Sequence, residues 1–118
     1  MSAKNYLQFV ILTVEPLNNQ NQNFRLGLNT LDFNQIQPSA IGIKSVEVFF
    51  GDNLFIIIAA LLTYQNYGKL VNPEISNWII VNHLHEYKIG RPTKLIFELT
   101  VTSKKHTYKL YKNQFLKS

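Results

Sequence analysis

The chain of 118 residues contains no cysteine, only seven acidic residues and only five glycines. The absence of cysteine excludes a disulfide framework, a thiolate nucleophile and any zinc site that needs cysteine ligands. The glycines are spread along the chain, so there is no glycine-rich loop to hold a phosphate. The acidic residues occur singly, so no carboxylate pair for glycoside hydrolysis is close in sequence. We therefore expect a protein that is not an enzyme and needs no cofactor.

Long hydrophobic runs are missing as well. The most apolar stretch, residues 54–62, has nine residues, whereas a helix that spans a bilayer needs about 20. The apolar run near the N-terminus is interrupted by Glu15 and Pro16, and no small-residue cleavage site follows it. We expect no signal peptide, no membrane partner, and a soluble protein of the cytoplasm or another intracellular compartment.

The remaining composition is that of a globular domain. Hydrophobic residues make up 46% of the chain and charged residues 16%, which is typical of a packed core with a lightly charged surface. A chain of this length usually forms one domain, and no repeat or linker divides it. The sequence predicts a single domain over residues 1–118.

Four segments in the first half have the composition and alternation of strands. They are residues 5–14, 24–31, 43–50 and 54–62. The turn-forming pair Gly51-Asp52 separates the last two and predicts a β-hairpin. Its second arm is apolar on both faces, so we expect it to be a central strand or to lie beneath a helix. The polar segments between the strands and after them, residues 17–23, 32–42 and 63–69, are predicted to be connectors.

One helix is predicted near residues 73–88. The residues that mark its two ends are Asn72, Pro73, Glu74, Gly90 and Pro92. The first three suit the N-cap, the first helical position and the positive end of the helix dipole. The last two suit a left-handed closing residue and a stop. The run "WIIV" at 78–81 has strand character, which leaves a strand as the alternative.

The C-terminal part is predicted to form two more strands, residues 93–101 and 106–116. In the second, His106, Tyr108 and Leu110 share one face, and Lys109, Tyr111 and Asn113 share the other. A short helix over 104–116 is the alternative. The fold class that follows is α+β, mainly antiparallel sheet of about six strands, in the form of a small OB-like barrel or an open sheet, with one helix.

The stretch "HLH" presents two histidines, His83 and His85, whose meaning depends on local structure. On a strand they would point the same way and could share a metal ion; on a helix they would point apart. The stretch resembles the metal-binding motif of HUH endonucleases. Two further stretches are similar to parts of that family: "FVILTV" at 9–14 to its first strand, and "YKLYK" at 108–112 to its tyrosine motif. This resemblance implies a metal-dependent enzyme that nicks single-stranded DNA. The helix signals around the histidines favour the other interpretation.

Positive charge is concentrated in the second half of the chain. Residues 1–60 carry three positive and four negative groups, whereas residues 61–118 carry nine positive and three negative groups. Lysines neutralise phosphates and aromatic rings stack on bases, so a basic aromatic region favours nucleic acid. The candidate binding residues are Arg91, Lys104, Lys105, Tyr108, Lys109, Tyr111 and Lys112.

The sequence therefore predicts a non-catalytic binding module or adaptor whose basic C-terminal third contacts nucleic acid or an acidic protein. A second hypothesis starts from surplus apolar residues in segments 49–62 and 76–81, which exceed what one half-exposed sheet requires. They predict a protein-assembly subunit that self-associates or binds another protein.

Overall fold

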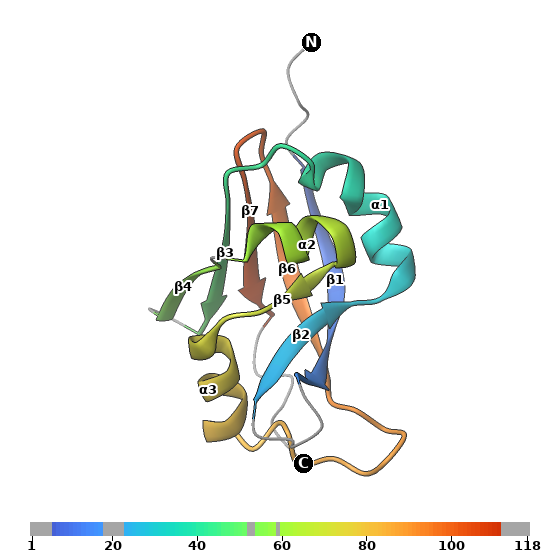
Figure 1. Ribbon diagram of the computed structural model, residues 1–118, viewed down its shortest axis with the longest axis vertical. Helices are drawn as coiled ribbons and strands as arrows, with labels where there is room; N and C mark the ends of the chain where they lie inside the picture. The colour runs from blue at the N-terminus through green and yellow to red at the C-terminus, as the bar shows by residue number, and fades with distance from the viewer. Residues whose placement is uncertain (1–5, 18–22, 52–53, 59, 112–118) are drawn as a thin grey trace.

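The computed structural model describes residues 6–17, 23–51, 54–58 and 60–111. This part of the chain forms seven strands and three helices, whose arrangement Figure 1 shows. The strands are β1 (Tyr6–Pro16), β2 (Phe24–Leu28), β3 (Ser45–Phe50), β4 (Leu54–Ile58), β5 (Lys69–Leu70), β6 (Lys94–Val101) and β7 (Lys105–Leu110). The helices are α1 (Thr30–Ala40), α2 (Leu61–Tyr67) and α3 (Pro73–Val81).

The strands form one strongly curled sheet in the order β4-β3-β7-β6-β1-β2-β5. Neighbouring strands are antiparallel except β3 and β7, which run parallel. Strand β7 is inserted between β3 and β6, so it joins the two halves of the sheet. The prediction of an α+β domain dominated by antiparallel sheet is confirmed, and the half-barrel shape is consistent with an OB-like fold.

Three local predictions are wrong. Residues 30–40 and 61–67 are helices, where polar connectors were expected over 32–42 and 63–69. Strand β4 lies at an edge of the sheet, so the first of the two alternatives for this segment, a central strand, is wrong, and the second, a strand beneath a helix, stays a prediction. The β3–β4 pair itself is antiparallel, as the predicted hairpin requires, although Asp52 of the predicted turn lies outside the described residues.

Helix α3 begins where the sequence predicts and ends earlier. The Asn72 side chain accepts a hydrogen bond from the Glu74 backbone N–H at 2.8 Å, and Pro73 occupies the first helical position. The last helical residue is Val81, because His83 adopts a left-handed conformation with φ of +58°. The expected extension to residue 88 is therefore wrong, and Gly90 belongs to a separate turn.

We expect Asn72→Ala to lower the free energy of unfolding by about 1 kcal/mol, because it removes an N-cap acceptor. Asn77→Ala is the matched control, since Asn77 is an exposed residue inside the same helix and alanine has the higher helix propensity. Urea unfolding monitored by Trp78 fluorescence measures both. Equal losses for the two variants would contradict the capping role of Asn72.

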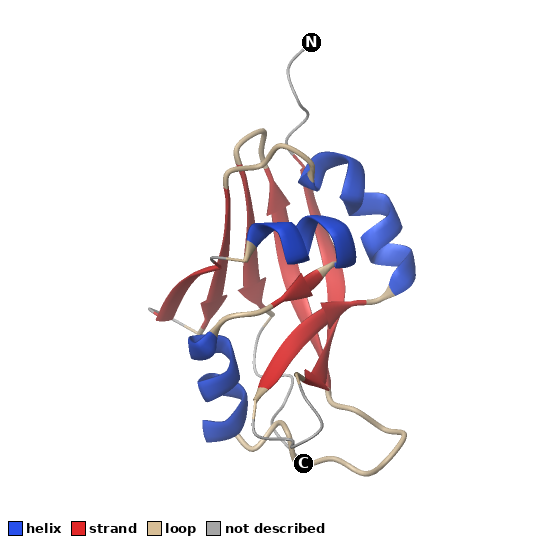
Figure 2. Ribbon diagram, viewed as in Figure 1, coloured by secondary structure: helices blue, strands red, loops and turns tan. Residues whose placement is uncertain are grey.

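All three helices pack against one face of the sheet, and the core lies between (Figure 2). In α3, Trp78 stacks on Phe50 of β3 with ring centroids 3.9 Å apart. Also in α3, the hydroxyl of Ser76 accepts a hydrogen bond from the Phe24 backbone N–H at 2.9 Å. In α1, Ile36 is fully buried. None of the helices in the described residues is long and apolar enough to cross a membrane.

Candidate functional site

The face of the sheet opposite the helices carries large apolar side chains that remain exposed. Successive side chains of a strand point to opposite faces. The core-facing set of β1 and β6 is buried, and the other set points outward. The exposed fractions are 55% for Leu7, 53% for Phe9, 39% for Ile96, 38% for Ile11 and 37% for Tyr111. These five residues are named the outer patch.

Two rings meet at the centre of the outer patch. Phe9 of β1 and Tyr111, directly after β7, have ring centroids 5.0 Å apart and an interplanar angle of 72°. Strand β6 lies between β1 and β7, so the two side chains reach across it. Phe49 of β3 lies on the same face, one strand beyond β7. Edge-to-face aromatic pairs are common inside proteins, but this pair is open to solvent.

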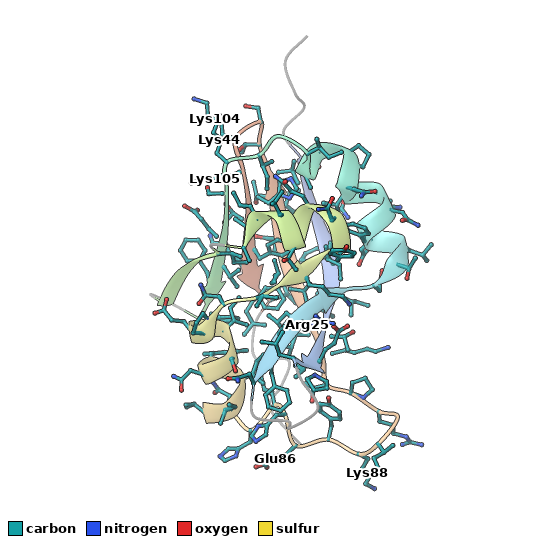
Figure 3. The ribbon with its side chains drawn as sticks, viewed as in Figure 1. Arg25, Lys44, Glu86, Lys88, Lys104 and Lys105 are labelled. Atoms are coloured by element: carbon teal, nitrogen blue, oxygen red, sulfur yellow. The ribbon has the colours of Figure 1, made fainter. Side chains whose placement is uncertain are left out.

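Lysines surround this aromatic surface. Lys109 is exposed on the outer face of β7 and is the register partner of Glu98 in β6. Lys94 is exposed at the start of β6. Lys44 and Lys104 meet at the opposite end of the sheet, where the Lys44 backbone N–H donates to the Lys104 carbonyl at 2.7 Å (Figure 3).

Lys105 starts β7 beside this end of the sheet. Its Nζ lies 3.1 Å from the Glu47 carboxylate, so its charge is already partly neutralised. The two lysines at the turn, Lys44 and Lys104, have no ion pair within the described part of the chain. They are therefore the better cations for an external anion.

The structure places the predicted binding residues in different parts of the molecule. Lys104, Lys105, Lys109 and Tyr111 lie on the outer face or at its end. Arg91 lies in the loop between α3 and β6, at the other end of the sheet. Lys112 lies outside the described residues. Tyr108 is fully buried, so its prediction as a binding residue is wrong.

Tyr108 belongs to a buried hydrogen-bond chain that connects β7 to α2 and α1. The Tyr64 hydroxyl lies 2.6 Å from the Tyr108 hydroxyl and 2.5 Å from Nδ1 of His106. On the other side of that imidazole, Nε2 lies 3.4 Å from the Ser39 hydroxyl. The Ser39 hydroxyl donates to the Ile36 carbonyl at 2.8 Å. These contacts fasten two helices to the centre of the sheet.

The chain of contacts fixes the protonation state of His106. The Ser39 hydroxyl already donates to a carbonyl, so we assign the hydrogen of the neutral imidazole to Nε2, which leaves Nδ1 of His106 to accept from Tyr64. Burial lowers the pKa of His106 to about 4, against a smaller raising effect of the Ser39 backbone. The imidazole is therefore neutral at pH 7 and serves as a structural hydrogen-bonding group.

The histidine pair lies on neither a helix nor a strand. Residues 82–85 form turns directly after α3. His83 is exposed, and its Nδ1 lies 3.2 Å from the Glu86 carboxylate. The half-buried His85 packs against Phe24, with ring centroids 5.3 Å apart. The strand that an HUH-like motif needs is absent here, and residues 6–17, 23–51, 54–58 and 60–111 contain no group of three metal-ligating side chains.

The outward residues of β1 are the part of this surface that the sequence analysis missed. Residues 7–12 are apolar at five of six positions, so alternation between an apolar and a polar face is absent. A strand of this kind looks buried on both sides. The signal that identifies the outer face lies in β7 and the residue after it, where Lys109 and Tyr111 alternate with the predicted core residues. That alternation is confirmed.

Comparison with known proteins adds no family assignment. A scan against family profiles, a search of curated proteins and a search of solved structures each found no significant match. The function must therefore be inferred from the surface itself.

Proposed function

We propose that this protein is a non-catalytic module that binds single-stranded nucleic acid on the uncovered face of its sheet. The observation that carries the proposal is the exposed Phe9–Tyr111 ring pair on that face. Exposed aromatic side chains on an open sheet give bases a flat surface on which to stack, whatever the sequence of the strand. Because stacking buries apolar area, it also explains why these rings remain on the surface.

The charges around the outer patch support the same ligand. The chain has a net charge of +5, and eight of its twelve lysines and arginines fall in residues 88–118. Lys109 lies beside the ring pair, and Lys94 and Lys104 lie toward the two ends of β6. A phosphate backbone that follows β6 passes all three lysines. This strand of eight residues is about 25 Å long. That length suits the lower part of the range of about 4–16 nucleotides per small domain.

We expect the double variant F9A/Y111A to weaken binding of a fluorescent oligothymidine by about 5- to 150-fold, because a base that stacks on the ring pair contributes about 1–3 kcal/mol. Tyr67→Ala is the matched control, since Tyr67 is an exposed tyrosine on α2 at the helical side of the molecule. Fluorescence anisotropy at constant salt measures the dissociation constants. Equal losses in both variants would place binding away from the outer patch.

The salt dependence tests the role of charge in the same assay. Affinity should fall steeply as salt rises, and the triple variant K104A/K105A/K109A should flatten that slope because it removes phosphate contacts. Binding that does not change with salt, or no binding at low salt, would overturn the proposal.

A second candidate ligand is a protein partner that binds the same face. The residues that favour it are Leu7, Ile11 and Ile96. These aliphatic side chains offer no stacking surface, and exposed apolar patches often mark protein interfaces. Light scattering distinguishes this candidate, because self-association predicts a mass that rises with concentration and falls in Ile96→Glu. Polyglutamate that competes with the oligonucleotide would indicate an acidic protein as the partner.

A further inference from the structure

A groove separate from the ring pair lies between the loop 82–93 and the start of β6. Its volume is about 450 Å³. The charged side chains that line it are those of Glu86, Lys88, Arg91 and Lys94, and the imidazole of His83 lies in the same lining. It is at the end of the molecule opposite to Lys44 and Lys104, as the labelled Lys88 and Glu86 show (Figure 3).

A tight turn places two cations side by side at this groove. The Arg91 backbone N–H donates to the Lys88 carbonyl at 2.9 Å, and Gly90 between them has a φ of +82°. This is the bond and the glycine position of a type II turn, whose first and fourth residues lie within about 7 Å of each other. Lys88 and Arg91 therefore extend from adjacent points of the backbone.

Hydrogen bonds hold the walls of the groove in place. The Thr93 hydroxyl donates to the Leu84 carbonyl at 2.7 Å, which connects the end of the loop to its beginning. The Tyr87 hydroxyl reaches the Val14 carbonyl at 3.5 Å, which connects the loop to β1. The groove is thus part of the fold and is formed before a ligand arrives.

The positive charge in the groove is not balanced by the protein. The described lining holds three cations, Lys88, Arg91 and Lys94, and one carboxylate, that of Glu86, whose oxygen lies 3.2 Å from Nδ1 of His83. Within the residues that the structure describes, Lys88, Arg91 and Lys94 have no ion pair. Like charges gathered around a concave surface repel one another and raise the local concentration of anions. A bound anion relieves that repulsion.

We infer that this groove binds a phosphate monoester. The guanidinium of Arg91 matches a phosphate with two parallel hydrogen bonds, and Lys88 and Lys94 add point charges. The volume exceeds that of a phosphate alone, so it leaves room for the group esterified to it. Two sources have this chemistry: a free small molecule and the terminal phosphate of a nucleic acid strand. Only the second source rests on the proposed function.

The first test uses inorganic phosphate as the probe, with amide chemical shifts in ¹H–¹⁵N spectra as the readout. At constant ionic strength, set with sodium chloride, we expect saturable shifts at Gly90, Arg91 and Thr93. The double variant K88A/R91A should weaken binding by at least about tenfold, because it removes the charged hydrogen-bond donors that hold the phosphate. The variant K44A/K104A removes the same charge at the opposite end of the sheet, and a loss of phosphate binding there as large as in K88A/R91A would contradict binding in the groove.

The second test compares an oligothymidine that carries a terminal phosphate at either end with the same oligothymidine without it. Tighter binding with the phosphate, lost in K88A/R91A, identifies the strand end as the source. If inorganic phosphate binds and the terminal phosphate gives no gain, the source is a free phosphate compound. If chloride produces the same shifts, or K88A/R91A binds phosphate as well as wild type, the inference is overturned. If F9A/Y111A still binds inorganic phosphate, the groove binds phosphate independently of the outer patch. The inference can then hold even where the proposed function fails.

Discussion

We expect the free energy of unfolding to fall by about 3 kcal/mol between pH 6.5 and pH 4 because of His106 alone. Above pH 6.5 this imidazole is neutral in the folded and the unfolded chain, so it adds no pH dependence. Below pH 6.5 the unfolded chain binds a proton that the folded chain excludes until about pH 4, where the folded pKa lies. Stability therefore decreases as the pH falls, by about 1.4 kcal/mol per pH unit.

A protonated His106 would also break the buried chain of contacts. Its Nδ1 would carry a hydrogen that points at the Tyr64 hydroxyl, which now donates to that nitrogen. The Tyr64 hydroxyl would have to reverse, and with it the contact to Tyr108. Both side chains are fully buried, so water cannot replace a lost partner.

Urea unfolding across this pH range measures the effect, and His106→Gln is the comparison because glutamine stays neutral. We expect the pH dependence to be flatter in the variant by about the same 3 kcal/mol. If the variant does not fold, the histidine proton resonances of the wild type give the answer directly. A midpoint near 6.5 for His106 would contradict the prediction.

Phe97→Ala is expected to lower the free energy of unfolding by about 3–5 kcal/mol, whereas Ile96→Ala should cost less than about 1 kcal/mol. The two residues are neighbours in β6 and point to opposite faces. Phe97 is fully buried and contacts Phe50 and Tyr108 edge-to-face, at centroid distances of 6.0 and 6.3 Å. Its removal leaves a cavity that the surrounding rings do not fill.

Chemical unfolding of both variants at pH 7 measures this difference, with the wild type as the reference. The comparison tests which face of the sheet is uncovered, on which the proposed binding surface depends. A cost for Ile96→Ala near that of Phe97→Ala would mean that the outer patch is packed against something, and the binding proposal would then need another surface.

The start of α3 was predictable because its signals are local. Asn72, Pro73 and Glu74 act through their own side chains and backbone, and neighbouring residues decide the outcome. The end of the helix was misjudged because Gly90 and Pro92 have the same local signature in a loop. The chain leaves the helix at His83, where a left-handed conformation is rare for a residue other than glycine.

The two missed helices depend on contacts between distant segments. Helix α1 buries only Ile36 and Ala40 in the described structure and contains Pro38, so its hydrophobic pattern is weak. It does have an N-cap, because the Asn29 side chain accepts a hydrogen bond from the Asp32 backbone N–H at 2.7 Å. Helix α2 continues the apolar run of β4 without punctuation, and its buried Tyr64 finds its partners more than 40 residues later.

The candidate site was predictable in part for the same reason. The alternation in β7 correctly placed Lys109 and Tyr111 on one face and Tyr108 on the other. Nothing local shows that Phe9 lies beside Tyr111, because that contact depends on the register of three strands. The grouping of Lys88, Arg91 and Lys94 likewise depends on the turn at Gly90 and on the start of β6.

The place of β7 between β3 and β6 has a consequence for how the chain folds. Until residues 105–110 are available, β4–β3 and β6–β1–β2–β5 are two separate sheets with unpaired edges at β3 and β6. Such edges are templates for aggregation, and pairing over about 60 residues of separation is slow. During synthesis on the ribosome the nascent chain therefore passes through a stage in which it has most of its strands and no complete sheet. We expect the chain to be most prone to aggregation at that stage.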